Sequence, residues 1–321
     1  MPPETPLQVY WSPDFLEHRV SPGHPESAAR LEAIIAGLRA AGLWDQVPRI
    51  DAPAVALERL QLIHPAGYVA RLQAAIDRGA RVVDSADTEV SAGSFQAALK
   101  MAGAGMQAVD DVLGGKTTAG FVLGRPPGHH ALPDLAMGFC LLANLALAAR
   151  HAQTAHGLER IAVIDWDVHH GNGTQAAFYN SAAVQFISLH EYPLYPGTGA
   201  ADESGSGAGL GFTCNIPLAA GAGDERYLQL LEGPVTDILT GYRPDMIFIS
   251  AGFDAHAADP LGHMQISSAG FAAMTRQIKQ LAGELCHGRI VSFLEGGYNL
   301  DALAESVVAH VAELAHRANT A

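Results

Sequence analysis

The chain has 321 residues, of which 49% are hydrophobic and 16% are charged, a composition typical of soluble globular proteins. Its formal net charge of −14 argues against binding to a nucleic-acid backbone, and it favours either simple solubility or the attraction of cationic substrates. The apolar segment 141–149 is about half as long as a membrane span, and the first residues lack the basic and apolar regions of a signal peptide.

Apolar, β-branched runs alternate with helical patterns along the whole chain. The predicted strands cover residues 7–10, 119–123, 161–164, 184–188, 246–250 and 290–294. The predicted helices cover residues 25–41, 95–113, 144–156, 224–241, 268–285 and 300–316. This alternation indicates an α/β fold with a mostly parallel sheet flanked by helices, and we expect a single domain over residues 1–321.

Polar segments follow four of the predicted strands directly. They read GRPPGHH, DWDVHH, AGFDAH and EGGY, after the strands at 119–123, 161–164, 246–250 and 290–294. Ligands of open α/β sheets bind at the carboxyl ends of the strands. We therefore expect these four loops to converge on one active site.

The DWDVHH segment carries a candidate metal site. Alternate residues of an extended segment point the same way, so Asp165, Asp167 and His169 can face one point. Asp254 adds a carboxylate at another strand end. Three ligands, Asp167, His169 and Asp254, would leave a fourth position for water or substrate, as in catalytic zinc sites. The alternatives are an ion-paired strand end and, for Asp254, an Asx-type turn.

Two further motifs offer catalytic groups. His129 and His130 are adjacent in an irregular loop, and a histidine beside a metal-bound water can act as a general base and then as a general acid. Tyr298 follows two glycines, and its phenol could hydrogen-bond a developing oxyanion. Each motif alone is also compatible with a purely structural loop or a core tyrosine.

Several patterns are interpreted as unrelated to catalysis. The glycine-rich stretch 205–211 precedes a predicted strand, so it is not a dinucleotide-binding fingerprint, which would open a helix. His151, His156 and His316 lie in polar helical stretches and are expected at the surface. The three cysteines, Cys140, Cys214 and Cys286, are far apart, which argues against disulfides and favours a reducing, cytoplasmic environment.

In this order the motifs resemble the histone deacetylase superfamily, which includes bacterial deacylases, acetoin-utilisation proteins and acetylpolyamine amidohydrolases. The matching segments run from residue 24 to 298 and read HPES, RPPGHHA, GFC, DWDVHHGNGTQ, SLHEYPLYPGTG, AGFDAH, DPLG and EGGY. The DWDVHHGNGT wording is most similar to the class II branch. The resemblance implies the α/β fold of the arginase and deacetylase type.

The resemblance also implies roles for individual residues. It makes Asp167, His169 and Asp254 the ligands of one catalytic Zn²⁺, although such a ligand set also accepts Fe²⁺. It assigns catalytic roles to His130 as general base, His129 as its partner, Asp165 as the residue that holds His129, Asn172 behind the base, and Tyr298 as the group that polarises the carbonyl. A neutral Asn172, where the class I branch has aspartate, should raise the pKa of His130 less than a carboxylate would.

Further positions match the substrate tunnel and an ion site of that family. The implied substrate contacts are the Gly138 carbonyl for the amide N–H, the walls Phe139 and Tyr195, Asp87 at the rim, and Leu261 in DPLG. The implied structural potassium site comprises Asp165, Asp167, His169, Ser188 and Leu189. A polyamine-selective branch carries glutamate where this chain has Leu261.

We therefore expect hydrolysis of an acyl-lysine amide in a peptide or protein. An acetylpolyamine amidohydrolase is the closest alternative. A binuclear manganese ureohydrolase and a catalytically inactive acyl-lysine or metal-binding module are the more distant ones. We expect neither nucleic acid nor membrane as a partner, while the preferred acyl group and the oligomeric state stay open.

Overall fold

The computed structural model describes residues 5–316, and within them eight parallel strands form one sheet in the order β2-β1-β3-β8-β7-β4-β5-β6. The strands are β1 Thr5–Trp11, β2 Arg49–Asp51, β3 Thr117–Val122, β4 Ile161–Asp165, β5 Val184–Glu191, β6 Thr213–Leu218, β7 Met246–Ala251 and β8 Ile290–Leu294. Every pairing along this order is parallel. The predicted α/β fold is thereby confirmed.

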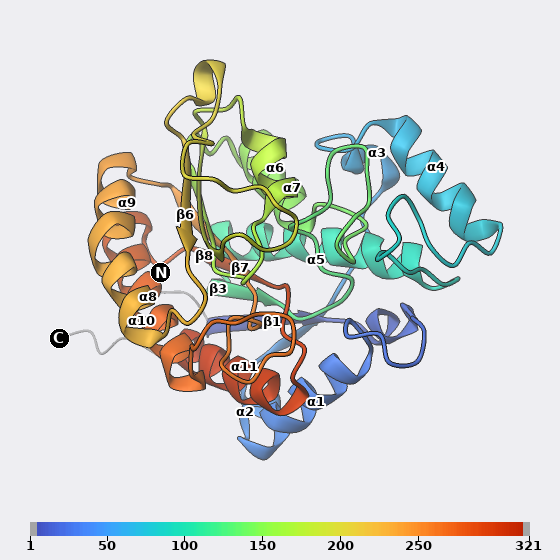
Figure 1. Ribbon diagram of the computed structural model, residues 1–321, viewed down its shortest axis with the longest axis horizontal. Helices are drawn as coiled ribbons and strands as arrows, with labels where there is room; N and C mark the ends of the chain where they lie inside the picture. The colour runs from blue at the N-terminus through green and yellow to red at the C-terminus, as the bar shows by residue number, and fades with distance from the viewer. Residues whose placement is uncertain (1–4, 317–321) are drawn as a thin grey trace.

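Helices cover both faces of the sheet (Figure 1). The helices α5 Ser94–Leu113 and α6 Asn144–His156 contact one face, and α1 Ala29–Ala40, α10 Ser268–Cys286 and α11 Leu300–Ala315 pack together on the other. Strands covered on both faces have no solvent-facing side, so they read as continuous apolar runs. This explains why β4, β7 and β8 are buried throughout.

The predicted helix at 224–241 is interrupted. The structure has α8 Asp224–Leu230, a π-helical turn Leu231–Val235 and α9 Thr236–Tyr242. Pro234 lies inside the turn, and a proline lacks the N–H that a regular helix needs there. The predicted helix at 25–41 begins at Ala29 instead, and Glu26, which precedes it, forms a buried ion pair with Arg125.

Several elements were missing from the prediction. They are β2, α2 Leu43–Gln46, α3 Leu57–Leu60, α4 Ala66–Asp77 and α7 Asn172–Phe178. Helix α4 did have a signal, because its buried residues Tyr68, Leu72 and Ile76 recur at helical spacing. With α5 it forms an apolar cluster separate from the main core. The segment that joins α4 to α5 carries Asp87, so this cluster holds the predicted rim residue in place.

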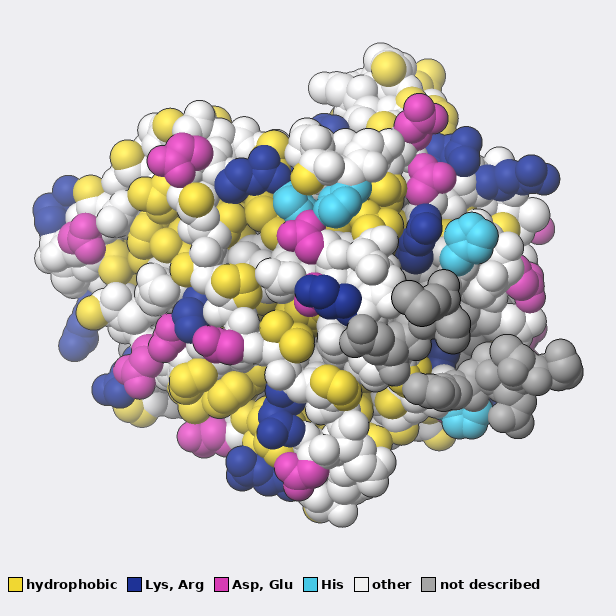
Figure 2. Space-filling view, turned by 180° about the vertical axis from the view of Figure 1, so that it is seen from behind, with side chains coloured by type: hydrophobic (Ala, Val, Ile, Leu, Met, Phe, Trp, Pro, Cys, Tyr) yellow, Lys and Arg dark blue, Asp and Glu magenta, His cyan; other side chains and the backbone are white. Residues whose placement is uncertain are grey.

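The surface has no large region of one charge on the face seen in Figure 2, where acidic and basic side chains are intermingled. The net charge of −14 is therefore not gathered into a docking surface on that face. Among residues 5–316, no helix combines the length and the apolarity that crossing a bilayer requires.

Candidate active site

The loops that follow β3, β4, β7 and β8 meet at the carboxyl ends of the strands, because all of these strands run in the same direction. Hydrogen bonds join the loops directly. The Val168 N–H donates to Asp254 Oδ1 at 2.8 Å, and the Gly296 N–H donates to Asp167 Oδ2 at 2.8 Å. The structure thus brings together the motifs that the sequence placed after four separate strands.

Asp167, His169 and Asp254 form a buried cluster with the chemistry of a metal site. His169 Nδ1 lies 3.1 Å from Asp167 Oδ1 and 3.2 Å from Asp254 Oδ2. One ligand-type atom of each residue lies within 4.8 Å of the others, and all three side chains are buried. Two carboxylate oxygens and one imidazole nitrogen suit Zn²⁺ or another first-row divalent ion.

The electrostatics of this cluster call for an additional positive charge. Burial, together with the charge of Asp167, raises the pKa of Asp254 to about 7. Burial lowers the pKa of His169, but hydrogen bonds to Asp167 and Asp254 outweigh it and bring that pKa to about 10. Two buried carboxylates therefore retain a proton between them and the imidazole. A divalent cation would take the place of that proton, so the three residues fit one metal ion.

Gly296 closes one side of the cluster. Its N–H donates to Asp167 Oδ2, and a Cβ at this position would meet the Asp254 carboxylate and lie 2.6 Å from Asp167 Oδ2. Only a glycine lets the backbone approach both carboxylates this closely.

Gly296→Ala is therefore expected to weaken zinc binding about tenfold to a hundredfold, since overpacking of this kind costs roughly 1–3 kcal/mol. Competition against a chelating dye measures the affinity. Gly283→Ala is the matched control, because a Cβ on Gly283 meets nothing within 4 Å. Equal zinc affinity in the two variants would show that Gly296 does not shape the site.

His130 is held as a neutral imidazole with one free nitrogen. Its Nδ1 lies 2.8 Å from Asn172 Oδ1, and the Asn172 amide nitrogen donates to the sulfur of Met137 at 3.3 Å. The amide therefore turns its carbonyl to His130, which makes Nδ1 the protonated nitrogen and leaves Nε2 with its lone pair. Burial and the charge of His129 lower the pKa of His130 well below its usual value. This histidine can therefore accept a proton.

His129 has the opposite character. Its Nδ1 lies 3.0 Å from Asp165 Oδ2, and its ring centroid lies 4.0 Å from that of His130. Burial lowers the pKa of His129, but the charges of Asp167 and Asp165 outweigh it and raise that pKa well above its usual value. The pair thus combines a neutral histidine with a protonated one.

Glu295 is a buried residue that the sequence reasoning missed. Its Oε2 accepts hydrogen bonds from the N–H groups of Gly128 at 2.7 Å and His129 at 3.2 Å. Burial raises its pKa to about 7. The carboxylate joins the EGGY loop to the loop that carries both histidines. The signal for it was its place at the end of a buried strand, where a carboxylate needs partners.

Arg30 is a second residue that the sequence reasoning missed, and it binds the backbone of the EGGY loop, residues 295–298. Its Nε donates to the Gly297 carbonyl at 2.6 Å, Nη2 donates to the Glu295 carbonyl, and Nη1 lies 3.0 Å from Glu26 Oε1. Its guanidinium carbon lies 5.1 Å from the centroid of the Tyr298 ring. A long-range contact of this kind between α1 and the loop after β8 leaves no local pattern in the sequence.

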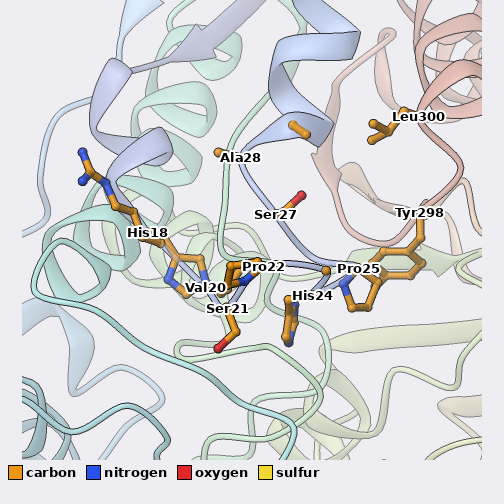
Figure 3. A pocket seen from close by; sticks show the side chains of 13 residues that line it. His18, Val20, Ser21, Pro22, His24, Pro25, Ser27, Ala28, Tyr298 and Leu300 are labelled. Atoms are coloured by element: carbon orange, nitrogen blue, oxygen red, sulfur yellow. The ribbon is translucent and has the colours of Figure 1, made fainter.

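Tyr298 lies where its phenol can act as a hydrogen-bond donor. Burial and the charge of Asp254 raise its pKa well above the usual value, so the phenol keeps its proton. Tyr298 also borders a cavity of about 500 Å³, which is lined mainly by residues 18–25 and 27–29 (Figure 3). Pro25 lies beside its ring in this view, and His24 lies on the other side of Pro25.

Aromatic side chains border the site at the predicted tunnel positions. The Tyr195 ring lies 5.1 Å from His130 and 6.1 Å from His169, centroid to centroid, and the Phe139 ring lies 6.0 Å from Tyr298. Burial and the charge of Asp87 raise the pKa of the Tyr195 phenol, so this predicted rim carboxylate lies near the aromatic wall.

Gly138 and Leu261 complete the predicted substrate contacts. Gly138 has a φ of +57°, and a Cβ there would collide with the His130 ring, so the close approach requires glycine. Its carbonyl already accepts the Cys140 thiol at 3.3 Å, and a second lone pair remains for a substrate N–H. Leu261 is partly buried, and its N–H donates to Asp259 Oδ1 at 2.9 Å.

The predicted potassium ligands share Asp167 and His169 with the metal cluster and add three residues of β4 and β5. Asp165 on β4 is paired with Ser188 on β5, and both are buried, as is Leu189. Asp165 Oδ1 accepts the Asp167 N–H at 3.2 Å, and the Ser188 hydroxyl lies 2.9 Å from His190 Nδ1. A potassium ion at these residues stays a prediction.

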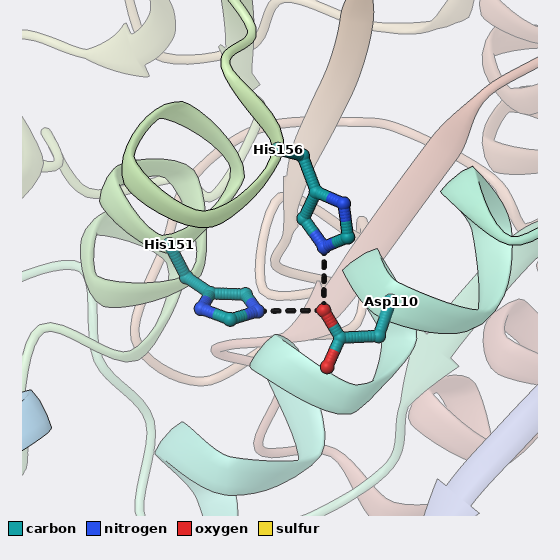
Figure 4. A group of neighbouring side chains, drawn as sticks. All are labelled: Asp110, His151 and His156. Carbon is teal, nitrogen blue, oxygen red and sulfur yellow. Dashed lines mark hydrogen bonds and ion pairs between the residues drawn. The ribbon is translucent and has the colours of Figure 1, made fainter.

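A second group of ligand-type side chains, Asp110, His151 and His156, joins α5 to α6 (Figure 4). His151 is only 9% exposed, so its expected surface position is wrong, whereas His156 is exposed. Arg59 Nη2 lies 2.6 Å from His151 Nδ1, and arginine has only donors, so the proton of His151 is on Nε2. That N–H donates to Asp110 Oδ1 at 2.7 Å. A metal ion beside Asp110 would need the Nε2 lone pair of His151, which the proton occupies. We therefore interpret the group as a hydrogen-bonded cluster.

Comparison with known proteins places this geometry in a family. The family model of the histone deacetylase domain matches residues 24–314. The chain is 42% identical over 278 residues to the histone deacetylase-like amidohydrolase of Pseudomonas aeruginosa, which covers 86% of this chain and 73% of that protein. It is 39% identical over 298 residues to the polyamine deacetylase HDAC10 of Homo sapiens, which covers 88% of this chain and 43% of the human protein. The crystal structure of the HDA15 HD domain is similar with a TM-score of 0.92 at 39% identity, covering 98% of this chain and 89% of that one. The chain therefore belongs to the histone deacetylase family.

Proposed function

We propose that the protein is a zinc-dependent deacylase that hydrolyses the amide of acyl-lysine in a peptide or protein. The supporting observation is a neutral imidazole, His130, beside the buried ligand set of Asp167, His169 and Asp254. A Zn²⁺ ion held by these three residues would supply Lewis acidity, which makes water more acidic and polarises the acyl carbonyl.

The chain's own residues would move the protons. His130 Nε2 accepts a proton from the attacking water as its oxygen bonds to the acyl carbon. The Asn172 carbonyl stabilises the imidazolium that results, through the Nδ1–H bond of 2.8 Å. When the carbon–nitrogen bond breaks, the histidine pair returns a proton to the lysine amine. The products are a carboxylic acid and the free ε-amine of the lysine side chain, so water is the only co-reactant.

Tyr298 would act on the carbonyl oxygen. Its phenol keeps its proton because burial raises its pKa, so it can donate to the oxygen as negative charge develops there. The carbonyl of Gly138, a residue that lies close to the His130 ring, would accept the N–H of the substrate amide.

Potassium at the predicted ion site is proposed on the family resemblance. Replacing KCl with a choline salt tests for its effect on activity.

Turnover of a fluorogenic acetyl-lysine peptide, with and without a chelator, tests the proposed function. We expect hydrolysis that the chelator abolishes and that added Zn²⁺ restores. An enzyme that hydrolyses the peptide equally well after complete removal of metal would contradict the zinc mechanism. A loaded protein that binds the peptide without turnover would indicate a binding module.

Deacetylation of acetylpolyamines is the second candidate, and a relative named polyamine deacetylase supports considering it. A polyamine carries a second ammonium several bonds from the scissile amide, so its selection calls for a carboxylate at the tunnel mouth. Leu261, which we expect at that place, is apolar and partly buried. Asp87 is a nearby carboxylate, and it already accepts hydrogen bonds from the Ser85 and Thr88 hydroxyls. These local residues favour the peptide substrate.

We therefore expect kcat/KM for an acetyl-lysine peptide to exceed that for acetylputrescine and acetylspermidine. Leu261→Glu should shift the ratio toward the polyamines, because it supplies the missing carboxylate. Leu261→Gln, which has a similar size and no charge, is the control. A tenfold advantage of either polyamine in the wild-type enzyme, about 1.4 kcal/mol in transition-state binding, would overturn the assignment.

A further inference from the structure

We infer that Asp259 is a positioning residue that sets the place of the Tyr298 phenol, an inference that rests on the proposed deacylase function. Asp259 lies in the loop between β7 and α10 and is 8% exposed. Its Oδ2 accepts the backbone N–H of Tyr298 at 2.7 Å and that of Asn299 at 3.3 Å. A carboxylate bonded to the backbone of Tyr298 itself is well placed to control where the phenol points.

The EGGY loop needs such external support. Gly296 and Gly297 have no side chains with which to anchor it, and Gly297 has a φ of +121°. The Gly296 N–H is bound by Asp167, and the Gly297 carbonyl is bound by Arg30. Asp259 provides the next attachment along the chain. Directly after it the Asn299 side chain caps α11, accepting the Ala302 N–H at 3.1 Å.

The same carboxylate orders the predicted tunnel rim. Asp259 Oδ1 accepts the N–H of Leu261 at 2.9 Å, while Oδ2 binds Tyr298. All of these partners are donors, so both oxygens must be acceptors. An asparagine can offer a carbonyl to one side only, and its NH₂ group would face an N–H on the other. Asp259→Asn thus keeps the size of the side chain and breaks the link between catalytic loop and rim.

A double-mutant cycle with Tyr298→Phe tests the inference. We expect Asp259→Asn to lower kcat on an acetyl-lysine peptide roughly 10²-fold, the effect of a misplacement of about 1 Å. In the Tyr298→Phe background the same change should lower kcat less than about threefold, because the phenol through which Asp259 acts is already gone. Asp259→Ser, which removes both carboxylate oxygens, is measured alongside and should behave in the same way.

Asp245→Asn is the matched control. Asp245 Oδ2 also accepts two backbone N–H groups, those of Glu159 at 3.1 Å and Arg160 at 2.8 Å, directly before β7 and so at the opposite end of the strands from the site. This variant should leave kcat within about twofold of wild type, whatever it does to the melting temperature.

Hydrogen–deuterium exchange of residues 296–300 gives a readout that does not depend on turnover. Asp259→Asn should speed exchange of this segment while zinc content stays stoichiometric. Equal losses of kcat in both backgrounds, or unchanged exchange with unchanged kcat, would overturn the inference. A wild-type enzyme without deacylase activity would refute the proposed function instead, and faster exchange in the variant would still establish the anchor.

Discussion

Asp254→Asn is expected to abolish stoichiometric zinc binding and, with it, deacylase activity. The substitution keeps the shape and the carbonyl that accepts the Val168 N–H, but it removes one of the two negative charges that face His169. Changes to residues that only orient a metal ligand cost about 10–100-fold in affinity. Loss of an anionic ligand should cost more, so we expect zinc affinity to fall by roughly 10²-fold or more. Elemental analysis and competition with a chelator measure it.

The hydrogen-bonded cluster of Asp110, His151 and His156 supplies the control. Asp110→Asn removes a carboxylate that also faces two imidazoles, yet it should leave zinc stoichiometry and kcat unchanged. A full complement of zinc together with wild-type turnover in Asp254→Asn would show that the ligand set is wrong. A fall in zinc stoichiometry in Asp110→Asn would show that the second cluster binds metal.

Tyr298→Phe is expected to lower kcat roughly 10²–10³-fold, about 2.7–4 kcal/mol of transition-state stabilisation. The ring and its neighbours, Phe139 and Arg30, keep their packing because only the hydroxyl is lost. The effect should fall on kcat more than on KM, because the hydrogen bond strengthens as charge develops on the carbonyl oxygen. Steady-state kinetics on an acetyl-lysine peptide give both constants.

Tyr242→Phe is the matched control for this change. Its hydroxyl donates to the Ala182 carbonyl at 3.1 Å, outside the site, so kcat should stay within about twofold of wild type. Zinc content should be the same in all three proteins. If Tyr298→Phe retained kcat within about threefold of wild type, the phenol would not be the oxyanion donor.

Most of the strands and the ligand positions could be predicted from local sequence. The strands at 161–164, 246–250 and 290–294 are apolar runs broken only by Ser250 and Ser292, because helices cover both faces of the sheet. The polar residues come directly after these runs, so their place at the carboxyl ends of the strands follows from parallel topology alone. Asp167, His169 and Asp254 were candidates on that basis.

Other features did not follow from helical periodicity. The break in the helix at 231–235 contains Pro234, and α1 begins only at Ala29, after Glu26 and its buried ion pair with Arg125. Pro234 was visible in the sequence, but helical periodicity continued on both sides of it. The depth of His151 could not be predicted either, because its partners Asp110 and Arg59 come from other helices.

The sequence by itself thus determined the α/β fold, the loops that carry chemistry and the residue types of the ligand set, because alternation and strand ends are local patterns. Only the tertiary structure decided how the site is held. Asp259, Glu295 and Arg30 attach the EGGY loop or the histidine loop by hydrogen bonds across separate elements. A buried carboxylate or guanidinium shows its role only through the partners that compensate for its lost hydration, and those partners are set by packing.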